Sequence, residues 1–149
     1  MPRGKTGQPA QYAPPHTITI LEDIPTPREL AADTPLCEFS DGDGARTSVW
    51  MALAKGDLYV HFLCSEIRPG EIIDHSTAID RDISQQVFVD VFIDANRDMR
   101  TYFQVRVTPK GHYTDVSRSV AGLDDDLARS SQMKILKTSV TNKGWSITF

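Results

Sequence analysis

The sequence predicts an all-β fold, a two-sheet antiparallel β-sandwich of the immunoglobulin-like or jelly-roll-like kind. Three observations lead to this prediction. Apolar residues recur at every second position in several segments, turn-forming residues separate those segments at short spacing, and no segment keeps a 3.6-residue period long enough for a helix. A chain of 149 residues fits one domain with a hydrophobic core of its own.

The beginning of the chain carries weak signals. Residues 1–15 are rich in Pro, Gly and Gln, and we interpret them as a flexible leader before a single domain that spans 16–149. A short β-like run covers 17–21. The stretch after it contains three prolines before residue 36, and proline cannot donate to a sheet ladder, so we expect loop or edge strand there.

Strand signals become strong from Thr47 onward. Segments 47–54 and 58–64 alternate around a Lys-Gly-Asp turn and predict a hairpin. Segment 87–93 is mostly apolar on both faces, with Asp90 as the exception, which is typical of a central strand. Segments 101–108 and 112–116 follow turns and continue the pattern. The predicted core contains Val49, Met51, Leu53, Val60, Val89, Val91, Phe103, Val105 and Val107.

A last hairpin is predicted from 133–140 and 144–149. The alternation still runs at Phe149, and domains rarely end inside a strand because following residues complete the ladder and cover its edge. We therefore expect that the domain lacks its final segment here, and that either the protein continues after Phe149 or a partner strand or further domain covers this edge.

Composition narrows the choice of partners. The net charge is −4, the pI is about 5.5, and no cluster of Lys and Arg offers a face for phosphates, which argues against nucleic acid. No apolar stretch approaches the roughly 18 residues of a membrane span, and no signal peptide begins the chain. Cys37 and Cys64 lie outside CxxC and zinc spacings, so a disulfide and two separate thiols both stay open.

Catalytic motifs are missing from the sequence. The four histidines are scattered, and neither Gly-x-Ser-x-Gly nor His-Glu-x-x-His occurs. No pair of carboxylates is singled out for glycoside hydrolysis. The sequence therefore predicts a binding domain and not an enzyme.

The segments from Thr47 to Phe149 resemble, in order, the carbohydrate-binding module family 9-like domains, which belong to the wider DOMON-like group of heme- and sugar-binding sandwiches. The resemblance lies in Thr47–Leu53, Asp57–Val60, Val89–Asp94, Tyr102–Gly111 and Gly144–Phe149. It implies a carbohydrate ligand and a parent protein that is secreted or associated with the periplasm or outer membrane. The tryptophan clamp of the best-known members has no counterpart near Gln85.

Sugars are bound by aromatic faces, with planar polar groups reading the hydroxyls around them. Tyr102 and Arg106 share one strand face and form the most attractive pair. Trp50 is either an exposed platform or a packing residue of a second layer. In the long connection after residue 65, His75, Arg81 and Asp82 offer further groups that could read hydroxyls, or Arg81 and Asp82 pair with each other.

Two alternatives stay open beside the carbohydrate hypothesis. A heme-b electron-transfer domain would need axial ligands from among Met51, Met99, His61 and His112, and a structural or interaction sandwich would need neither ligand. Calcium is the one cofactor that the oxygen-rich turns suggest. The candidate calcium ligands are Asp41, Asp43, Asp94, Asn96 and Asp98.

Overall fold

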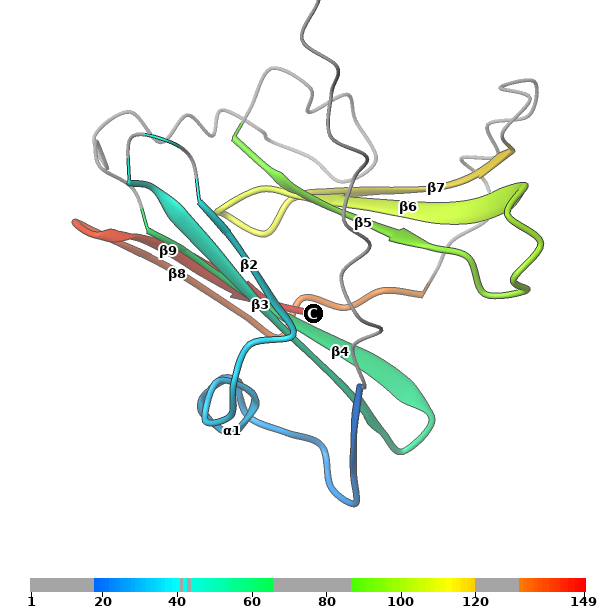
Figure 1. The fold of residues 1–149 in the computed structure, drawn as a ribbon, viewed down its shortest axis with the longest axis horizontal. Coiled ribbons are helices and arrows are strands. Elements are labelled where there is room, and N and C mark those ends of the chain that lie inside the picture. Colours follow the sequence, from blue (N-terminus) through cyan, green and yellow to red (C-terminus); the bar gives the residue numbers. More distant parts are fainter. Residues whose placement is uncertain (1–17, 41, 43, 66–86, 120–131) are drawn as a thin grey trace, which may run out of the picture.

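The computed structural model describes residues 18–40, 42, 44–65, 87–119 and 132–149, and nearly all the regular structure among them is β-strand. Two sheets face each other as the two layers of a sandwich, which confirms the predicted fold class (Figure 1). The strands are β1 (Thr19–Leu21), β2 (Cys37–Ser40), β3 (Arg46–Ala54), β4 (Asp57–Ser65), β5 (Val89–Ile93), β6 (Thr101–Val107), β7 (Tyr113–Ser119), β8 (Lys137–Thr141) and β9 (Gly144–Thr148).

The larger sheet has the order β1-β3-β4-β9-β8, and two short strands share the outer edge of β3. β2 pairs with the first half of β3 in the antiparallel sense, whereas β1 pairs with the last three residues of β3 in the parallel sense. The β1–β3 pair is thus an exception to the predicted antiparallel arrangement. Both predicted hairpins, β3–β4 and β8–β9, are present.

The smaller sheet has three antiparallel strands in the order β5-β6-β7. Its register sets Asp90 opposite Arg106 and Tyr102 opposite Arg118. Facing residues of an antiparallel pair share one side of the sheet, so these four side chains lie on the same face. The odd-numbered residues of β5 and β6 point the other way, toward the larger sheet.

The core lies between the two sheets and confirms most of its predicted members. Val49, Val60, Val91, Val105 and Val107 are buried in one cluster. Met51 and Val89 pack against this cluster while partly buried, and Phe103 is half-buried. The cluster also contains residues beyond the predicted set, most of them from β4 and the last strand: Phe62, Cys64, Trp145, Ile147 and Phe149.

The prediction for Leu53 is wrong, because this side chain is 39% exposed. Leu53 is the next-to-last residue of β3, just before the turn at Lys55 and Gly56, so it lies at the rim of the sandwich. Period-two alternation identifies the face of a residue but not whether the opposite sheet reaches far enough to cover it.

A second, smaller cluster lies on the outer face of the larger sheet, beneath the one-turn helix α1 (Pro27–Leu30). Leu30 of α1 packs there with Trp50 and Tyr59, and the small side chains of Ala52 and Ala54 leave room for the helix. A capping box begins α1: Glu29 N–H donates to Thr26 Oγ1, and Thr26 N–H donates to the Glu29 carboxylate at 2.7 Å.

The expectation of loop or edge strand is therefore wrong at Pro27–Leu30. Proline fits the first turn of a helix, because its missing N–H would have no partner inside the helix at that position. The same stretch then enters β2, which is indeed an edge strand of only four residues.

The last strand, β9, lies between β4 and β8, so both of its edges are paired. Phe149 continues this pairing: its N–H donates to the Val60 carbonyl, and the Val60 N–H donates to the Phe149 carbonyl at 2.8 Å. In the described part of the chain, the unpaired edge on this side of the sheet belongs to β8 and not to β9. Continuation of the protein after Phe149 stays a prediction.

Neither Cys37 nor Cys64 is part of a disulfide. Cys37 on β2 and Cys64 on β4 point toward the core, but the whole of β3 separates their strands. Two strand spacings amount to about 9.6 Å, beyond the roughly 7 Å that a disulfide spans between Cα atoms. The question that the sequence left open is thus decided for two separate thiols.

Candidate functional site

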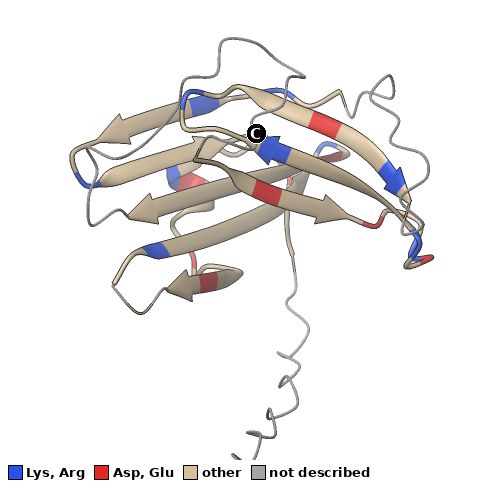
Figure 2. Ribbon diagram, turned by 90° about the horizontal axis from the view of Figure 1, so that it is seen from above, with Lys and Arg blue, Asp and Glu red and all other residues tan. Residues whose placement is uncertain are grey.

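The outer face of the smaller sheet carries an unusual mixture of aromatic and charged side chains. Alternation along β5 and β6 turns valines toward the core and sends the residues between them outward. Figure 2 views this sheet from above, with acidic and basic residues on its strands. We call this surface the aromatic-polar face, and it consists of Phe88, Asp90, Phe92, Tyr102, Gln104 and Arg106.

An ion pair forms the centre of this face. Arg106 donates from Nε to Asp90 Oδ1 at 2.9 Å and from Nη2 to Asp90 Oδ2 at 3.0 Å. Gln104 Nε2 donates a third hydrogen bond to Asp90 Oδ2 at 3.0 Å. The Arg106 guanidinium also lies 4.0 Å from the centre of the Phe88 ring, a cation–π contact.

These contacts fix the roles of the pair. Asp90 accepts hydrogen bonds from two guanidinium donors of Arg106. These two donors therefore orient the Asp90 carboxylate and do not contact a ligand hydroxyl. A carboxylate has about four acceptor sites, and three hydrogen bonds to Asp90 leave one of them for a ligand. Asp90 therefore has the capacity to accept from a hydroxyl while its orientation stays fixed.

Beside the ion pair lie two aromatic rings. Phe92 and Tyr102 have ring centroids 5.7 Å apart and planes tilted by 57°. Phe92 is 59% exposed and Tyr102 is half-buried, so the pair presents aromatic surface to solvent. They are diagonal neighbours, because Phe92 faces Gln104 across the two strands. Sequence reasoning missed Phe92, although it shares the alternating phase of Asp90.

The structure brings only some of the predicted ligand residues together. Tyr102 and Arg106 lie on the same face, as predicted. His75, Arg81 and Asp82 fall outside the described residues, so nothing tests their predicted role.

Trp50 lies on the other sheet and is only 8% exposed. Its Nε1 donates to the Asp33 carbonyl at 2.8 Å, and its ring is tilted against His61 at a centroid distance of 5.5 Å. Of the two interpretations that the sequence allowed, the structure supports the packing residue of a second layer. The prediction of Trp50 as a ligand-binding residue is corrected accordingly, since a ring this buried offers no stacking platform.

The turn from Asp94 to Arg100 binds its own backbone. Asp94 accepts from the N–H groups of Asp98 and Met99, and Asp98 accepts from those of Arg100 and Thr101 at 2.6 and 2.7 Å. These hydrogen bonds lower the pKa of the Asp98 carboxyl to about 2.

The side chain of Asn96 also donates to Asp98, so the oxygens predicted for calcium serve the turn itself. Among the described residues, no three His, Cys, Asp or Glu side chains gather as a metal site. Asp41 and Asp43 lie outside the described residues. Calcium binding stays a prediction for both turns.

The heme alternative meets a geometric obstacle at one of its candidate pairs of axial ligands, Met51 and His61. Met51 faces the core, whereas His61 faces outward, with its Nδ1 at 2.8 Å from Thr148 Oγ1. Side chains on opposite faces of one sheet cannot bind the same iron, so this pair does not supply both axial ligands. Burial lowers the pKa of His61.

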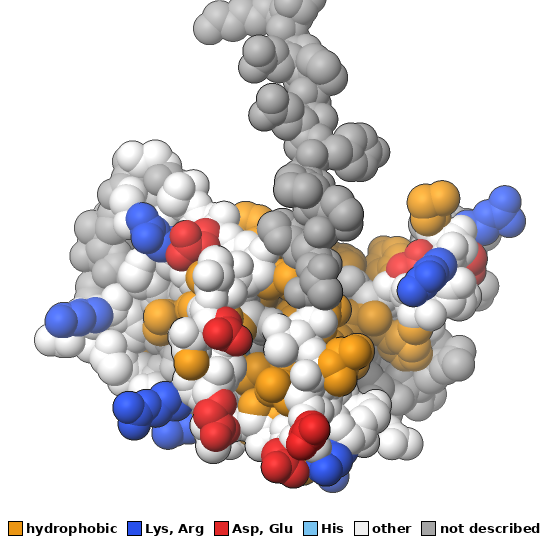
Figure 3. Space-filling model, turned by 60° about the horizontal axis from the view of Figure 1, so that its bottom comes forward, with side chains coloured by type: hydrophobic (Ala, Val, Ile, Leu, Met, Phe, Trp, Pro, Cys, Tyr) orange, Lys and Arg blue, Asp and Glu red, His pale blue; other side chains and the backbone are white. Residues whose placement is uncertain are grey.

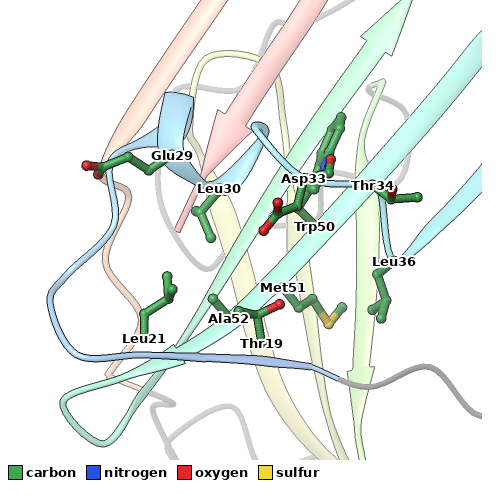
Figure 4. Close-up of a pocket in the computed structure, with 10 residues that line it drawn as sticks. All are labelled: Thr19, Leu21, Glu29, Leu30, Asp33, Thr34, Leu36, Trp50, Met51 and Ala52. Atoms are coloured by element: carbon green, nitrogen blue, oxygen red, sulfur yellow. The ribbon is translucent and has the colours of Figure 1, made fainter.

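A small pocket lies on the side of the larger sheet that carries α1, at the place where β1 and β2 part (Figures 3 and 4). Its lining includes Leu30, Asp33 and Trp50, while the Glu29 carboxylate points away and caps the helix. The pocket measures about 60 Å³, well below the roughly 150 Å³ void that holds a benzene ring in another protein. It has room for a few water molecules and not for a sugar.

Comparison with known proteins returned no match: no family model fits the chain, and neither a curated protein nor a solved structure is significantly similar to it. No helix in the described part of the chain is long and apolar enough to cross a membrane. The function must therefore be argued from the geometry of the aromatic-polar face.

Proposed function

We propose that this protein is a non-catalytic carbohydrate-binding domain and that the aromatic-polar face is its binding surface. One observation carries the proposal: the solvent-facing pair Phe92 and Tyr102 lies beside a carboxylate whose orientation is fixed by Arg106 and Gln104. Exposed aromatic rings next to preset polar groups are what a sugar requires of its receptor.

The chemistry of a pyranose matches both parts of this surface. Its C–H patches stack on aromatic faces, and its hydroxyls pair with planar hydrogen-bonding groups. Phe92 and Tyr102 would supply the stacking surface, and Asp90 would accept from a hydroxyl. The described residues of this face form a sheet surface, so we expect weak binding that improves with the number of sugar units in contact.

The resemblance to carbohydrate-binding modules of family 9 supports the same proposal independently of the geometry. It also implies that the domain works inside a longer secreted or outer-membrane protein, where it would hold that protein on a glycan. On this proposal Tyr102 keeps the role expected from the sequence, and Phe92 takes the place that Trp50 was expected to hold.

Isothermal titration against a panel of soluble oligosaccharides, after a glycan-array screen, tests the proposal. We expect a saccharide that binds the wild-type protein and loses at least about tenfold in affinity in both Phe92→Ala and Tyr102→Ala, which corresponds to 1.4 kcal/mol. Phe39→Ala is the matched control, because Phe39 is 61% exposed on β2 of the other sheet.

Two outcomes would contradict the proposal. If no saccharide binds the wild-type protein, the carbohydrate function is wrong. If binding occurs but survives both substitutions, the binding surface lies elsewhere. An absorption band of bound heme in the purified protein would favour the heme alternative instead.

A further inference from the structure

The turn that joins β5 to β6 stands at one end of the aromatic-polar face. Residues 94–100 follow directly after Phe92 and Ile93, and Tyr102 comes two residues after the turn. Figure 2 shows this turn at the right-hand end of the sheet with basic and acidic residues on it. A glycan that stacks on Phe92 and Tyr102 would therefore meet the side chains of the turn next.

Acidic and basic side chains of this turn behave differently. The carboxylates of Asp94 and Asp98 accept backbone N–H donors of the turn, so they are held against its backbone. Arg97 and Arg100 are exposed, and neither pairs with a carboxylate of the described residues. The turn thus exposes its guanidinium groups to a ligand, whereas its carboxylates are hydrogen-bonded to its own backbone.

A third arginine faces the aromatic pair from β7. Arg118 stands directly opposite Tyr102 in the register of β6 and β7, and facing residues share one side of the sheet. Arg118 has an interaction of its own, so the cations available to a ligand beside the aromatic pair are Arg97 and Arg100 on the turn. The fourth arginine of this sheet, Arg106, is neutralised by Asp90.

The charge of this part of the chain contrasts with the rest. Residues 87–119 contain five basic and four acidic residues, a net charge of +1. The whole chain carries −4, so the remaining residues carry −5 together. The face that holds α1 carries both acidic and basic side chains around its apolar centre (Figure 3).

We propose that the saccharide bound at the aromatic-polar face is acidic, with carboxylate or sulfate groups that the guanidinium groups of Arg97 and Arg100 bind. Guanidinium groups match both anions, because their parallel N–H donors form paired, charge-assisted hydrogen bonds. This inference rests on the proposed carbohydrate function and names the class of saccharide. The positive groups select for charge, whereas Phe92 and Tyr102 provide the stacking that any pyranose uses.

Affinity for matched acidic and neutral ligands tests the inference on the full chain. The ligands are a tetramer of galacturonic acid, a sulfated disaccharide and neutral tetramers of glucose and xylose, titrated at 50 and 300 mM salt. We expect an acidic ligand to bind at least about tenfold more tightly than the neutral ones at 50 mM, and to lose most of this preference at 300 mM. Preference for carboxylate over sulfate, or the reverse, identifies the anion.

Substitutions separate the roles of the arginines and the rings. The double variant Arg97→Gln, Arg100→Gln should lower affinity for the acidic ligand about tenfold or more, with neutral ligands unaffected. Arg28→Gln on α1 is the charge-matched control and should bind like the wild type. Tyr102→Ala should weaken both ligand types.

Equal affinity for acidic and neutral saccharides would overturn the inference and leave the carbohydrate function standing, as would unchanged acidic binding in the double variant Arg97→Gln, Arg100→Gln. A similar loss in the Arg28→Gln control would also overturn it, because net charge and not this site would then explain the binding. Absence of binding by every saccharide would overturn the proposed function itself.

Discussion

Asp90 and Arg106 face each other across β5 and β6 and are joined by two hydrogen bonds, while a third reaches Asp90 from Gln104. Their side chains are only 18% and 25% exposed, so water screens the pair incompletely. The Phe88 ring covers the guanidinium at 4.0 Å. This cluster joins the two strands of the candidate site on the side away from the core.

Removing one member of this pair should destabilise the domain. Arg106→Ala would leave a half-buried carboxylate with only the Gln104 hydrogen bond, and we expect the free energy of unfolding to fall by about 2 kcal/mol. Urea denaturation of Arg106→Ala, Asp90→Asn and the double variant measures the coupling between the two residues. Additive effects of the two substitutions would show that the pair is not coupled.

The sequence predicted the strands of this fold well because alternation and turn residues are local signals. Val49, Val60, Val91 and Val105 are buried as their period-two positions require. What alternation cannot reveal is which face of a strand is covered when both faces are apolar. On β3, Trp50 lies on the face away from the main core, and it is buried because α1 and the residues before β2 fold over it.

The same limit explains why the sequence does not identify Phe92 as part of the candidate site. Phe92 is a large apolar residue in a strand whose two faces are mostly apolar, which predicts burial, yet its side chain is 59% exposed. Its exposure follows from how the strands are arranged in the tertiary structure, which the pattern of a single strand does not contain. The sequence does identify Tyr102 and Arg106, because Gln104 lies between them on the same face of β6 and marks that face as polar.

The Asp98 carboxyl should contribute to stability in acid. Its pKa in the folded protein is about 2, whereas an unfolded aspartate has a pKa near 3.9. The unfolded chain therefore binds the proton first, so the stabilisation is complete above about pH 4 and is lost as the pH falls toward 2.

Thermal unfolding between pH 2 and pH 6 checks this expectation. Asp98→Asn cannot ionise, so its melting temperature should fall less steeply below pH 4 than that of the wild type, and it should be lower than the wild type at pH 6. Parallel curves for the two proteins would show that this turn does not hold the carboxylate in its charged form.

Protonation of His61 should destabilise the fold at mildly acid pH. Burial lowers the pKa of His61 in the folded protein, while the unfolded chain titrates near 6.5. Between the folded pKa and about 6.5 the unfolded state binds more protons, so stability decreases as the pH falls through this window. Urea denaturation of the wild type and His61→Gln from pH 7.5 to pH 5 should show a weaker pH dependence in the variant; an unchanged slope would contradict the prediction.

Gly144 begins β9 at a point of close approach between two strands. A Cβ atom added there would lie 2.0 Å from the Cys64 carbonyl oxygen and 2.9 Å from the Ser65 Cα, and the backbone has a φ of +143°. Neither neighbour is a flexible side chain that could turn away. Gly144→Ala must therefore push β9 off β4 and disturb the core around Trp145, which lies next in the strand and is 3% exposed.

Gly56 provides the matched control, because its φ is also positive at +89° but an added Cβ would meet no atom within 4 Å. Gly56→Ala should lose about 1 kcal/mol of folding free energy, because alanine disfavours a positive φ. Gly144→Ala also has an unfavourable positive φ, and a clash with the backbone of β4 in addition. We expect Gly144→Ala to lower the free energy of unfolding by at least about 2 kcal/mol more than Gly56→Ala, as measured by urea denaturation. Equal losses in the two variants would mean that β4 and β9 can separate at Gly144 without cost, and the close pairing described here would be wrong.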